Sequence, residues 1–340
     1  MRRPEGFAGV AVMVMVVALI FSSCGENKSS APSPVPTAVP LEHFADWDAV
    51  TLNAEFSSRM WPAVMSFNGK LWVIAGMQDP GGTKLNDVWS STNGAYWVQE
   101  KASAEFSPRF RHSWTVHNNK MWIIGGSDDN SNYNNDVWYS SNGVDWQLAT
   151  GNAGFEPRFA HRSVSFGGKL WVISGQNAGD PWVTRDAWYS TDGVEWKAAT
   201  RNANFIEGVV SFACFTFNNK MWVACGESDD MHNEVYSSSD GVIWNPFVNI
   251  PFLTRVAPTY FTYGGMMYIG GGYDDMTVND VLKDMWRSKD GYNWEKVTDD
   301  LSYGYMMKQA AVNFNNRIYL VGGSTNREEG YSVNSVYMSK

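Results

Sequence analysis

The sequence predicts an all-β fold, a six-bladed β-propeller of four-stranded antiparallel blades. The first supporting observation is composition: of 340 residues, 44% are hydrophobic and 18% charged, and Gly, Trp, Tyr and Phe are frequent. Such a mixture favours short strands joined by glycine turns over long helices. The second is a unit that recurs six times at intervals of 46 to 51 residues, as judged from one aromatic position. A repeat of this length is typical of propeller blades.

Each unit opens with two apolar strands joined by a two-residue turn. The turn pairs are Asn-Gly, Asn-Asn or Gly-Gly, which tolerate the positive φ of a tight hairpin. The segments are FNGKLWVIAG from Phe67, HNNKMWIIGG from His117, FGGKLWVISG from Phe166, FNNKMWVACG from Phe217, YGGMMYIGGG from Tyr263 and FNNRIYLVGG from Phe314. The aromatic of the second strand is Trp72, Trp122, Trp171, Trp222, Tyr268 or Tyr319. We therefore expect one inner hairpin per unit.

A second hairpin follows, with Asn-Gly or Asp-Gly at its turn. Its copies are VWSSTNGAYW from Val88, VWYSSNGVDW from Val137, AWYSTDGVEW from Ala187, VYSSSDGVIW from Val235 and MWRSKDGYNW from Met285. The sixth copy is VYMSK and stops at Lys340, whereas ADWDAVT from Ala45 matches VDWQLAT from Val144. We expect Trp47 to supply the outer strand of the last blade, so that the ring is closed and its strand edges are protected.

The segment before the repeats has the layout of an export signal. In residues 1–23, basic residues precede an apolar run from Phe7 to Ile20. The run ends in Phe21-Ser22-Ser23-Cys24, which resembles the lipobox of bacterial lipoproteins, where the cysteine is lipidated. An ordinary signal peptide with an incidental cysteine is the alternative.

Residues 24–43 are rich in Ser and Pro and are predicted to tether the propeller, residues 44–340, to a membrane. The expected location is the bacterial cell envelope, in the periplasm or on the outer surface, with the lipid anchor as the membrane contact.

Two further cysteines, Cys214 and Cys225, lie in one predicted hairpin. With Asn218-Asn219 as the turn, Cys214 faces Val223 and Cys225 lies on the diagonal. A disulfide there would be strained. Two small buried thiols are the preferred interpretation.

The glycine doublet after the second strand, followed by spaced Tyr and Trp residues, resembles the kelch repeat over residues 45–340. The doublet is complete in three units and is Ala75-Gly76, Ser174-Gly175 and Cys225-Gly226 in the others. The resemblance implies a propeller but no single function, because kelch-like propellers include oxidases, epimerases and many binding modules. The Ser-x-Asp-Gly-x-x-Trp turn also resembles a shortened Asp-box, which is a structural motif of sialidases.

The charge of the chain argues against a nucleic-acid partner. The formal net charge is −9 and the pI is about 5.1. Binding to phosphate backbones requires clustered Lys and Arg.

Repetition separates scaffold from candidate site. Residues that recur in every unit are expected to pack, whereas irregular positions on the face with long loops are candidates for binding. Fourteen of the 17 tryptophans recur and are assigned to packing. The residue that follows each first turn is Lys70, Lys120, Lys169, Lys220, Met266 or Arg317. Nine positions before it the chain should enter the innermost strand, and the residues there are Trp61, Arg111, Ala160, Ser211, Ala257 and Lys308. From this irregular ring, Trp61, Arg111 and Lys308 are candidate ligand contacts.

Two positions earlier, four units carry an arginine: Arg59, Arg109, Arg158 and Arg255. Because they recur, a structural role at the rim and a ligand contact both remain open.

Arg111 follows Pro108-Arg109-Phe110, and the resemblance to kelch binding modules implies that the second arginine of such a run lies on the pocket. Its guanidinium suits a carboxylate or an acidic sugar. A solvated rim arginine paired with an Asp is the alternative.

Three other features are weaker candidates. His112 and His161 occupy equivalent positions in adjacent units, but two histidines without a third donor favour a structural role over a metal site. Trp182 is predicted at a loop tip, where it stacks on a ligand or folds back onto the propeller.

The loops after the glycines carry Asp128-Asp129, Asp229-Asp230 and Asp274-Asp275. Asx turns are preferred there over Ca²⁺ binding, because no loop has the spacing of a dedicated calcium site. We therefore predict no cofactor and no metal.

The preferred functional hypothesis is a monomeric, lipid-anchored, non-catalytic binding or scaffold module for a glycan or an envelope protein. The alternative is a carbohydrate-active enzyme such as an epimerase or mutarotase of acidic sugars, with Arg111 holding a carboxylate and a nearby acid or His transferring a proton.

Overall fold

The computed structural model describes residues 44–79, 81–128, 130, 132–205, 208–247, 250–274, 281–304, 306–325 and 332–340. The predicted signal segment, Cys24 and the tether lie outside these residues, as do Asp129 and Asp275. All of the described residues belong to one compact unit of the chain. Within the described ranges, no helix has the length and apolar character needed to cross a bilayer.

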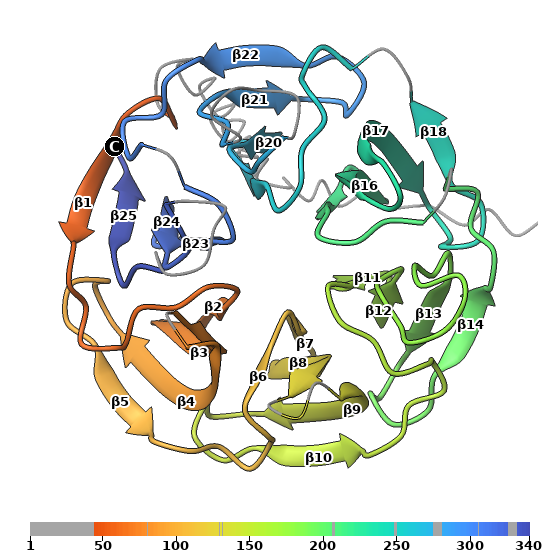
Figure 1. The fold of residues 1–340 in the computed structure, drawn as a ribbon, viewed down its shortest axis with the longest axis horizontal. Helices are drawn as coiled ribbons and strands as arrows, with labels where there is room; N and C mark the ends of the chain where they lie inside the picture. Colours follow the sequence, from red (N-terminus) through yellow and green to blue (C-terminus); the bar gives the residue numbers. More distant parts are fainter. Residues whose placement is uncertain are drawn as a thin grey trace, which may run out of the picture. The chain divides into compact units, whose positions relative to one another are not determined.

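The regular elements of the described residues are β-strands in antiparallel sheets, which confirms the all-β prediction (Figure 1). Four sheets contain four strands each. These are β11 (Arg162–Phe166), β12 (Lys169–Ile173), β13 (Ala187–Ser190) and β14 (Lys197–Thr200); β15 (Ala213–Phe217), β16 (Lys220–Glu227), β17 (Met231–Ser238) and β18 (Asn245–Phe247); β19 (Thr259–Tyr263), β20 (Met266–Gly270), β21 (Met285–Ser288) and β22 (Glu295–Thr298); and β23 (Ala310–Phe314), β24 (Arg317–Val321), β25 (Val336–Ser339) and β1 (Trp47–Thr51).

The fifth sheet contains two more four-stranded sets. One is β2 (Ala63–Phe67), β3 (Lys70–Gln78), β4 (Thr83–Ser91) and β5 (Val98–Lys101); the other is β7 (Ser113–His117), β8 (Lys120–Asp128), β9 (Tyr133–Ser140) and β10 (Gln147–Thr150). The two-residue strand β6 (Arg109–Phe110) joins them, because it pairs with both β4 and β8.

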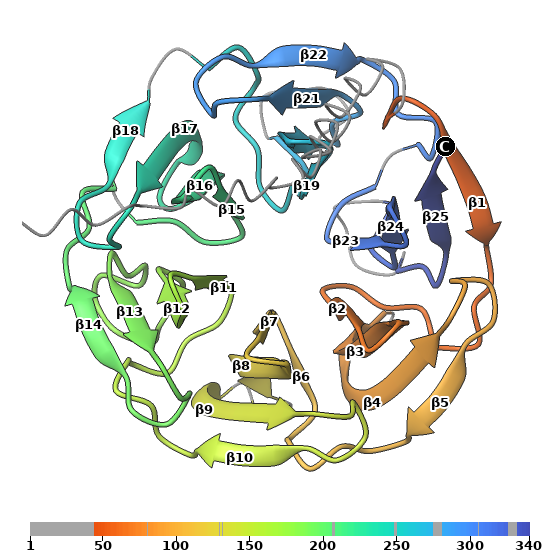
Figure 2. The ribbon, with the colours of Figure 1, turned by 180° about the vertical axis from the view of Figure 1, so that it is seen from behind.

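The sets are arranged around a common centre, with the first strand of each set innermost and the fourth at the periphery (Figures 1 and 2). β1 pairs antiparallel with β25, with Trp47 opposite Ser339, so the first and last strands of the described chain share a sheet.

The inner hairpins have the register expected from the sequence. Phe67 lies opposite Lys70, and the turn residues Asn68 and Gly69 between them have φ of 48° and 70°. Cys214 lies opposite Val223 as predicted. Both inner cysteines are free and buried, and burial raises the pKa of each thiol to about 12.

The repeated tryptophans of the second strands pack between neighbouring sets, as predicted. Trp72 is 2% exposed and lies against Gly143 of the next set, where an added Cβ would stand 2.2 Å from the indole ring. The equivalent pairs are Trp122 with Gly193, Trp171 with Gly241, Trp222 with Gly291 and Tyr319 with Gly94. Tyr268 instead packs against Phe44, with the ring centroids 4.6 Å apart. The turn glycine is therefore required by the aromatic side chain of the preceding set.

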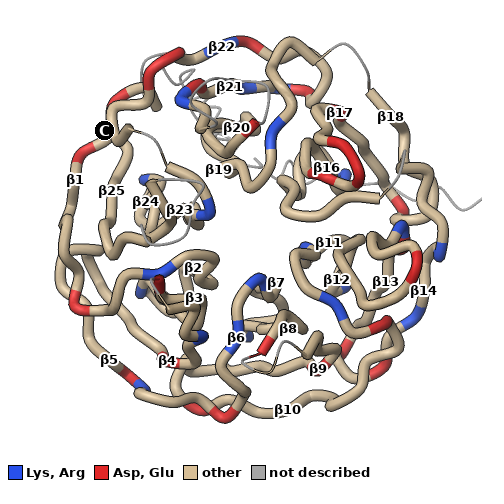
Figure 3. The backbone as a smooth tube through the Cα atoms, viewed as in Figure 1, with Lys and Arg blue, Asp and Glu red and all other residues tan. Residues whose placement is uncertain are grey.

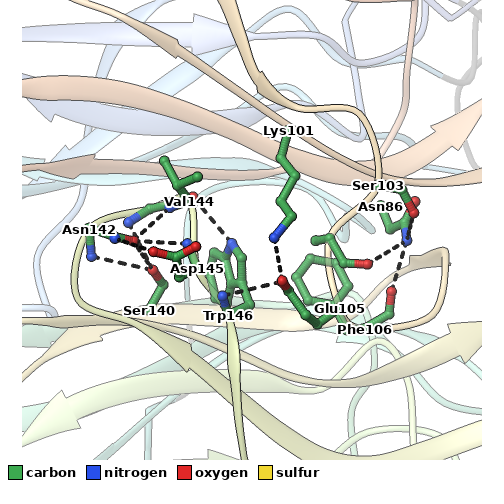
Figure 4. A network of polar contacts seen from close by, with 12 residues as sticks. Asn86, Lys101, Ser103, Glu105, Phe106, Ser140, Asn142, Val144, Asp145 and Trp146 are labelled. Atoms are coloured by element: carbon green, nitrogen blue, oxygen red, sulfur yellow. Dashed lines mark hydrogen bonds and ion pairs between the residues drawn. The ribbon is translucent and has the colours of Figure 1, made fainter.

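The outer turn is held by side-chain hydrogen bonds (Figure 4). Asn142 accepts backbone N–H bonds from Val144 and Asp145, both at 2.9 Å, and the Ser140 hydroxyl accepts one from Gly143 at 2.8 Å. Glu105, which is also paired with Lys101, accepts the Trp146 backbone N–H at 3.2 Å. The Asp-box-like motif is thus an Asx turn, and the hydrogen bond from Trp146 to Glu105 connects it to the segment that follows the fourth strand of the preceding set.

Candidate functional site

The four recurring arginines are buried in ion pairs. Arg59 is fully buried and donates two hydrogen bonds to the Asp87 carboxylate, at 2.7 and 2.9 Å. The Trp89 indole N–H donates to the same carboxylate at 2.7 Å. The equivalent triads are Arg109 with Asp136 and Trp138, Arg158 with Asp186 and Trp188, and Arg255 with Asp284 and Trp286.

These triads favour the structural alternative over ligand contact. Each arginine also lies over a phenylalanine ring, for example Arg158 at 5.3 Å from the centroid of Phe155. Burial alone would raise the pKa of Asp186, but the hydrogen bonds and charge of Arg158, with the Trp188 indole, hold that pKa below its usual value. The pairs therefore fix the segment that precedes each inner hairpin to the third strand or to the residue directly before it.

The irregular ring predicted from the sequence lines one cavity of about 330 Å³ at the centre of the sets. Its members share a left-handed backbone with φ between 50° and 60°: Trp61, Arg111, Ala160, Ser211, Ala257 and Lys308. Backbone hydrogen bonds connect neighbours in the ring, including Trp61 N–H to Lys308 C=O at 3.0 Å and Ala160 N–H to Arg111 C=O at 2.8 Å. Each set thus contributes one side chain at the point where the chain enters its innermost strand.

Two cations of this ring lie against one indole. The Arg111 guanidinium carbon is 4.3 Å from the Trp61 ring centroid, and the Lys308 ammonium nitrogen is 4.9 Å from it. Arg111 also lies 5.5 Å from the centroid of Phe159. These cation–π contacts hold both positive groups at the cavity wall.

Arg111 has a hydrogen-bond donor without a partner. Its Nε is buried, and none of the described residues accepts a hydrogen bond from it. Burial lowers the pKa of Arg111, and the charge of Arg162 acts in the same direction, whereas Tyr273 and Glu227 oppose the shift. The guanidinium still carries its charge near neutral pH, because the ordinary pKa of arginine is so high.

The cavity is cationic. Arg162 joins Arg111 and Lys308 in its wall, and no Asp or Glu is present among the described residues that line it. Arg162 is held by an Nε–H bond to the Phe212 carbonyl at 2.8 Å and lies 5.6 Å from the Tyr260 ring centroid. Lys and Arg segments accordingly lie at the inner ends of the sets near β7, β11 and β23 (Figure 3). A concave site walled by charges of one sign concentrates ions of the opposite sign.

The two histidines are neutral; His112 lines the cavity, whereas His161 does not. Both are fully buried, and neither ring nitrogen of His112 has a hydrogen-bond partner among the described groups. Burial, with the charge of Arg109, lowers the pKa of His112 to about 3. Burial and the charges of Arg158 and Arg162 lower the pKa of His161 well below its ordinary value, against a smaller opposing effect of the Ile124 carbonyl. In the part of the chain that the structure describes, no group of three or more His, Cys, Asp or Glu could hold a metal ion.

The remaining candidates lie outside the cavity wall. Trp182 is half-buried, packs with the cluster that contains Phe159 and Val210, and donates its indole N–H to Asp229 at 3.2 Å. Asp128 accepts backbone N–H bonds from Asn130 and Asn132 at 2.9 and 3.0 Å, which is the Asx-turn arrangement. Trp182 therefore folds back onto the domain, and Asp128 caps its own loop.

Arg162 is the cavity residue that the sequence interpretation missed. It stands two positions after Ala160 of the irregular ring, where the other sets have Ala63, Ser113, Ala213, Thr259 and Ala310. A comparison of the six repeats at the position two residues after the irregular ring would have identified Arg162, because it is the one charged side chain among the six.

Comparison with known families gives one match. A family model described as the KLHDC2/KLHL20/DRC7 Kelch-repeats domain matches residues 61–240, which is more than half of the chain. The matched segment begins at Trp61 and includes Arg111 and Arg162, whereas Lys308 lies beyond it. A comparison with curated proteins gives no match.

Proposed function

Because this chain belongs to the Kelch-repeat family, we propose that it is a non-catalytic binding module that holds an anionic group of its partner in the central cavity. Kelch-repeat domains generally mediate binding between proteins. The observation that carries the proposal for this chain is the cavity wall, with Arg111, Arg162 and Lys308 and no carboxylate among its described residues.

The proposed scaffold is a propeller of six four-stranded blades, closed by β1. The antiparallel pairing of β1 with β25 supports closure. The contact of Phe44 with Tyr268 supports it as well, because Phe44 stands where the other junctions have a turn glycine.

A carboxylate satisfies what this cavity lacks. A buried donor without a partner costs free energy, and a ligand oxygen that accepts from Arg111 Nε would remove that cost. The planar guanidinium also matches the geometry of a carboxylate. Trp61 holds Arg111 and Lys308 at the wall before the ligand arrives, so less side-chain entropy is lost on binding.

The titratable groups of the cavity argue against the alternative of an epimerase. An acid or base that works near neutral pH has a pKa near that pH. Burial holds the pKa of His112 at about 3 and that of Cys214 at about 12, and it raises the pKa of Tyr260. These three groups keep one protonation state near pH 7, which suits binding better than proton transfer.

The proposed partner is a glycan or a protein of the bacterial cell envelope, and the proposed protein is a monomer attached by a lipid on Cys24. The signal-like segment 1–23 and the Ser/Pro-rich residues 24–43 support this location. Removal of the lipid should release the protein from membranes into the soluble fraction.

The test is calorimetric titration of the purified protein with glucuronate and with glucose. We expect glucuronate to bind at least tenfold more tightly, and Arg111→Ala to weaken its binding by ten- to a hundredfold, as hydrogen bonds to charged groups predict. Arg201→Ala is the matched control, because Arg201 is exposed and stacks on Trp188 outside the cavity. Equal affinities for the two sugars, or an Arg111→Ala variant that binds as the wild type does, would contradict the proposal.

A further inference from the structure

We propose that the cationic cavity is the entrance of a longer ligand channel, and that the ligand is a carboxylate with an extended, uncharged and largely apolar tail. The inference rests on the proposed function, because the carboxylate would be held by the same Arg111. It adds a second subsite, for the tail, and with it a chemical class of ligand.

A second cavity of about 370 Å³ lies at the other end of the innermost strands. Five of its lining residues are each the second-to-last residue of an inner strand, directly before the hairpin turn region: Val116, Ser165, Thr216, Thr262 and Asn313. The ring residues that line the first cavity stand two positions before the start of the same strands: Arg111, Ala160, Ser211, Ala257 and Lys308. The two cavities therefore occupy opposite ends of the space that the inner strands enclose.

The two cavities adjoin through a shared collar. Six residues line both of them: Thr115, Val116, Cys214, Tyr260, Ala311 and Val312. A ligand that passes this collar contacts the first cavity with one end and the second with the other. None of the six collar side chains carries a charge near neutral pH, since burial holds the Cys214 thiol protonated.

The two ends differ in charge. Three cations line the first cavity, whereas no Lys, Arg, Asp, Glu or His is found among the described residues that line the second. The accessible apolar residues of the second cavity are Val116, Ala311 and Val312 of the collar, and its other polar groups are hydroxyls and one amide, all without charge. A second charge on the ligand would lose its hydration there without a partner. An alkyl chain instead gains free energy by leaving water.

The polarity of the channel therefore fixes the direction of the ligand. The carboxylate would lie beside Arg111 and Lys308, and the tail would run past Val116 and Ala311 toward the hairpin turns. Acids with short tails fill the first cavity alone, and longer ones reach the second.

The test is a titration series with acetate, butyrate, hexanoate and octanoate. Each buried methylene is expected to lower Kd about fourfold. We expect this gain to continue to octanoate, because the collar leads the tail into the second cavity.

Val116→Trp should block the collar. Val116 is 37% exposed and lines both cavities, so an indole there enters the channel without displacing packed neighbours. We expect this variant to lose the affinity that octanoate gains over butyrate, so that the ratio of its Kd values for the two acids approaches one, whatever its affinity for butyrate. Val98→Trp is the matched control, because Val98 is 62% exposed on the peripheral strand β5. Thr216→Trp, which fills only the second cavity, gives an independent measurement if Val116→Trp does not fold.

The outcomes separate the two proposals. If all four acids bind with equal affinity, and Arg111→Ala abolishes that binding, the tail subsite is wrong and the proposed function stands. If Val116→Trp and Thr216→Trp leave octanoate binding unchanged, the tail does not pass the collar and the inference is overturned. If none of the four acids binds but glucuronate does, the tail subsite is wrong and the proposed function stands; if glucuronate does not bind either, both proposals fail.

Discussion

The buried triads predict that arginine and aspartate stabilise the fold only together. The triad of Arg158, Asp186 and Trp188 provides the test, because the β23–β25 set of the same chain has Met306, Ser335 and Tyr337 at the equivalent positions. That set folds without the ion pair. The perturbations are Arg158→Met, Asp186→Ser and the double variant that combines them.

The magnitude follows from the contacts. Arg158 is fully buried and donates to Asp186 at 2.6 and 2.8 Å, to the Ser174 carbonyl at 2.8 Å and to the Glu156 carbonyl at 3.0 Å. Removing it leaves a carboxylate that is mostly buried, with Trp188 as its remaining donor in the triad. Breaking such a pair from one side costs about 3–5 kcal/mol of unfolding free energy, whereas replacing both partners costs much less.

Urea denaturation followed by circular dichroism measures this difference for the three variants. We expect each single substitution to lower the free energy of unfolding by about 3–5 kcal/mol, and the double variant to lose less than Arg158→Met alone. The slopes of the denaturation curves should stay equal, so that the midpoints report stability. If the double variant loses the sum of the two single losses, the pair is not coupled and the reasoning is wrong.

Two further predictions concern packing and pH. Gly143→Ala should destabilise the domain by several kcal/mol more than Gly265→Ala. Both glycines have positive φ, so the backbone strain of the two substitutions is similar. A Cβ on Gly143 would stand 2.2 Å from Trp72, whereas nothing lies within 4 Å of a Cβ on Gly265. Similar midpoints for the two variants in thermal unfolding would show that the indole moves aside freely. The pKa of His112 is lowered from 6.5 to about 3 in the folded state, so the unfolded chain takes up the proton first and stability falls as pH decreases below 6.5. Between pH 6.5 and 5, the free energy of unfolding should fall by at most about 1.4 kcal/mol per pH unit for each of His112 and His161. His112→Leu should reduce this pH dependence by the contribution of one histidine. An unchanged pH dependence in that variant would refute the assignment.

The sequence predicted most of the local structure because the repeats supply comparisons within one chain. Asn-Gly and Gly-Gly pairs permit positive φ, and alternation fixes which strand residues face each other, so the position of Cys214 opposite Val223 followed directly. The ring that contains Trp61 and Arg111 was found for the same reason, since a position that varies among otherwise similar units is not explained by packing alone.

The role of the four arginines did not follow from the spacing used to find them. Their partners lie 27 to 29 residues later, in the third strand or directly before it, and only the folded set brings the two together. A signal was present nevertheless. The sets with an arginine have Asp-x-Trp in the third strand, whereas those with Val209 or Met306 have Glu234-Val235-Tyr236 or Ser335-Val336-Tyr337. Because the arginine and the aspartate are present together in four repeats and absent together in two, the pattern indicates that the two side chains contact each other.

The direction in which a loop side chain points could not be predicted from the sequence. Trp182 was expected at a loop tip, either stacked on a ligand or folded back, and its hydrogen bond to Asp229 depends on a loop of the following set. The second cavity also could not be predicted, because its wall is made of residues that alternate regularly along every inner strand and differ in no evident way from packing residues.

A crystal structure of the protein with glucuronate bound would test the proposed anion site most directly. We expect the carboxylate in the cavity lined by Trp61, Arg111 and Lys308, with an oxygen about 3 Å from a guanidinium nitrogen of Arg111. A glucuronate carboxylate bound elsewhere, at the peripheral strands or in the outer turns, with the central cavity holding only water, would contradict it.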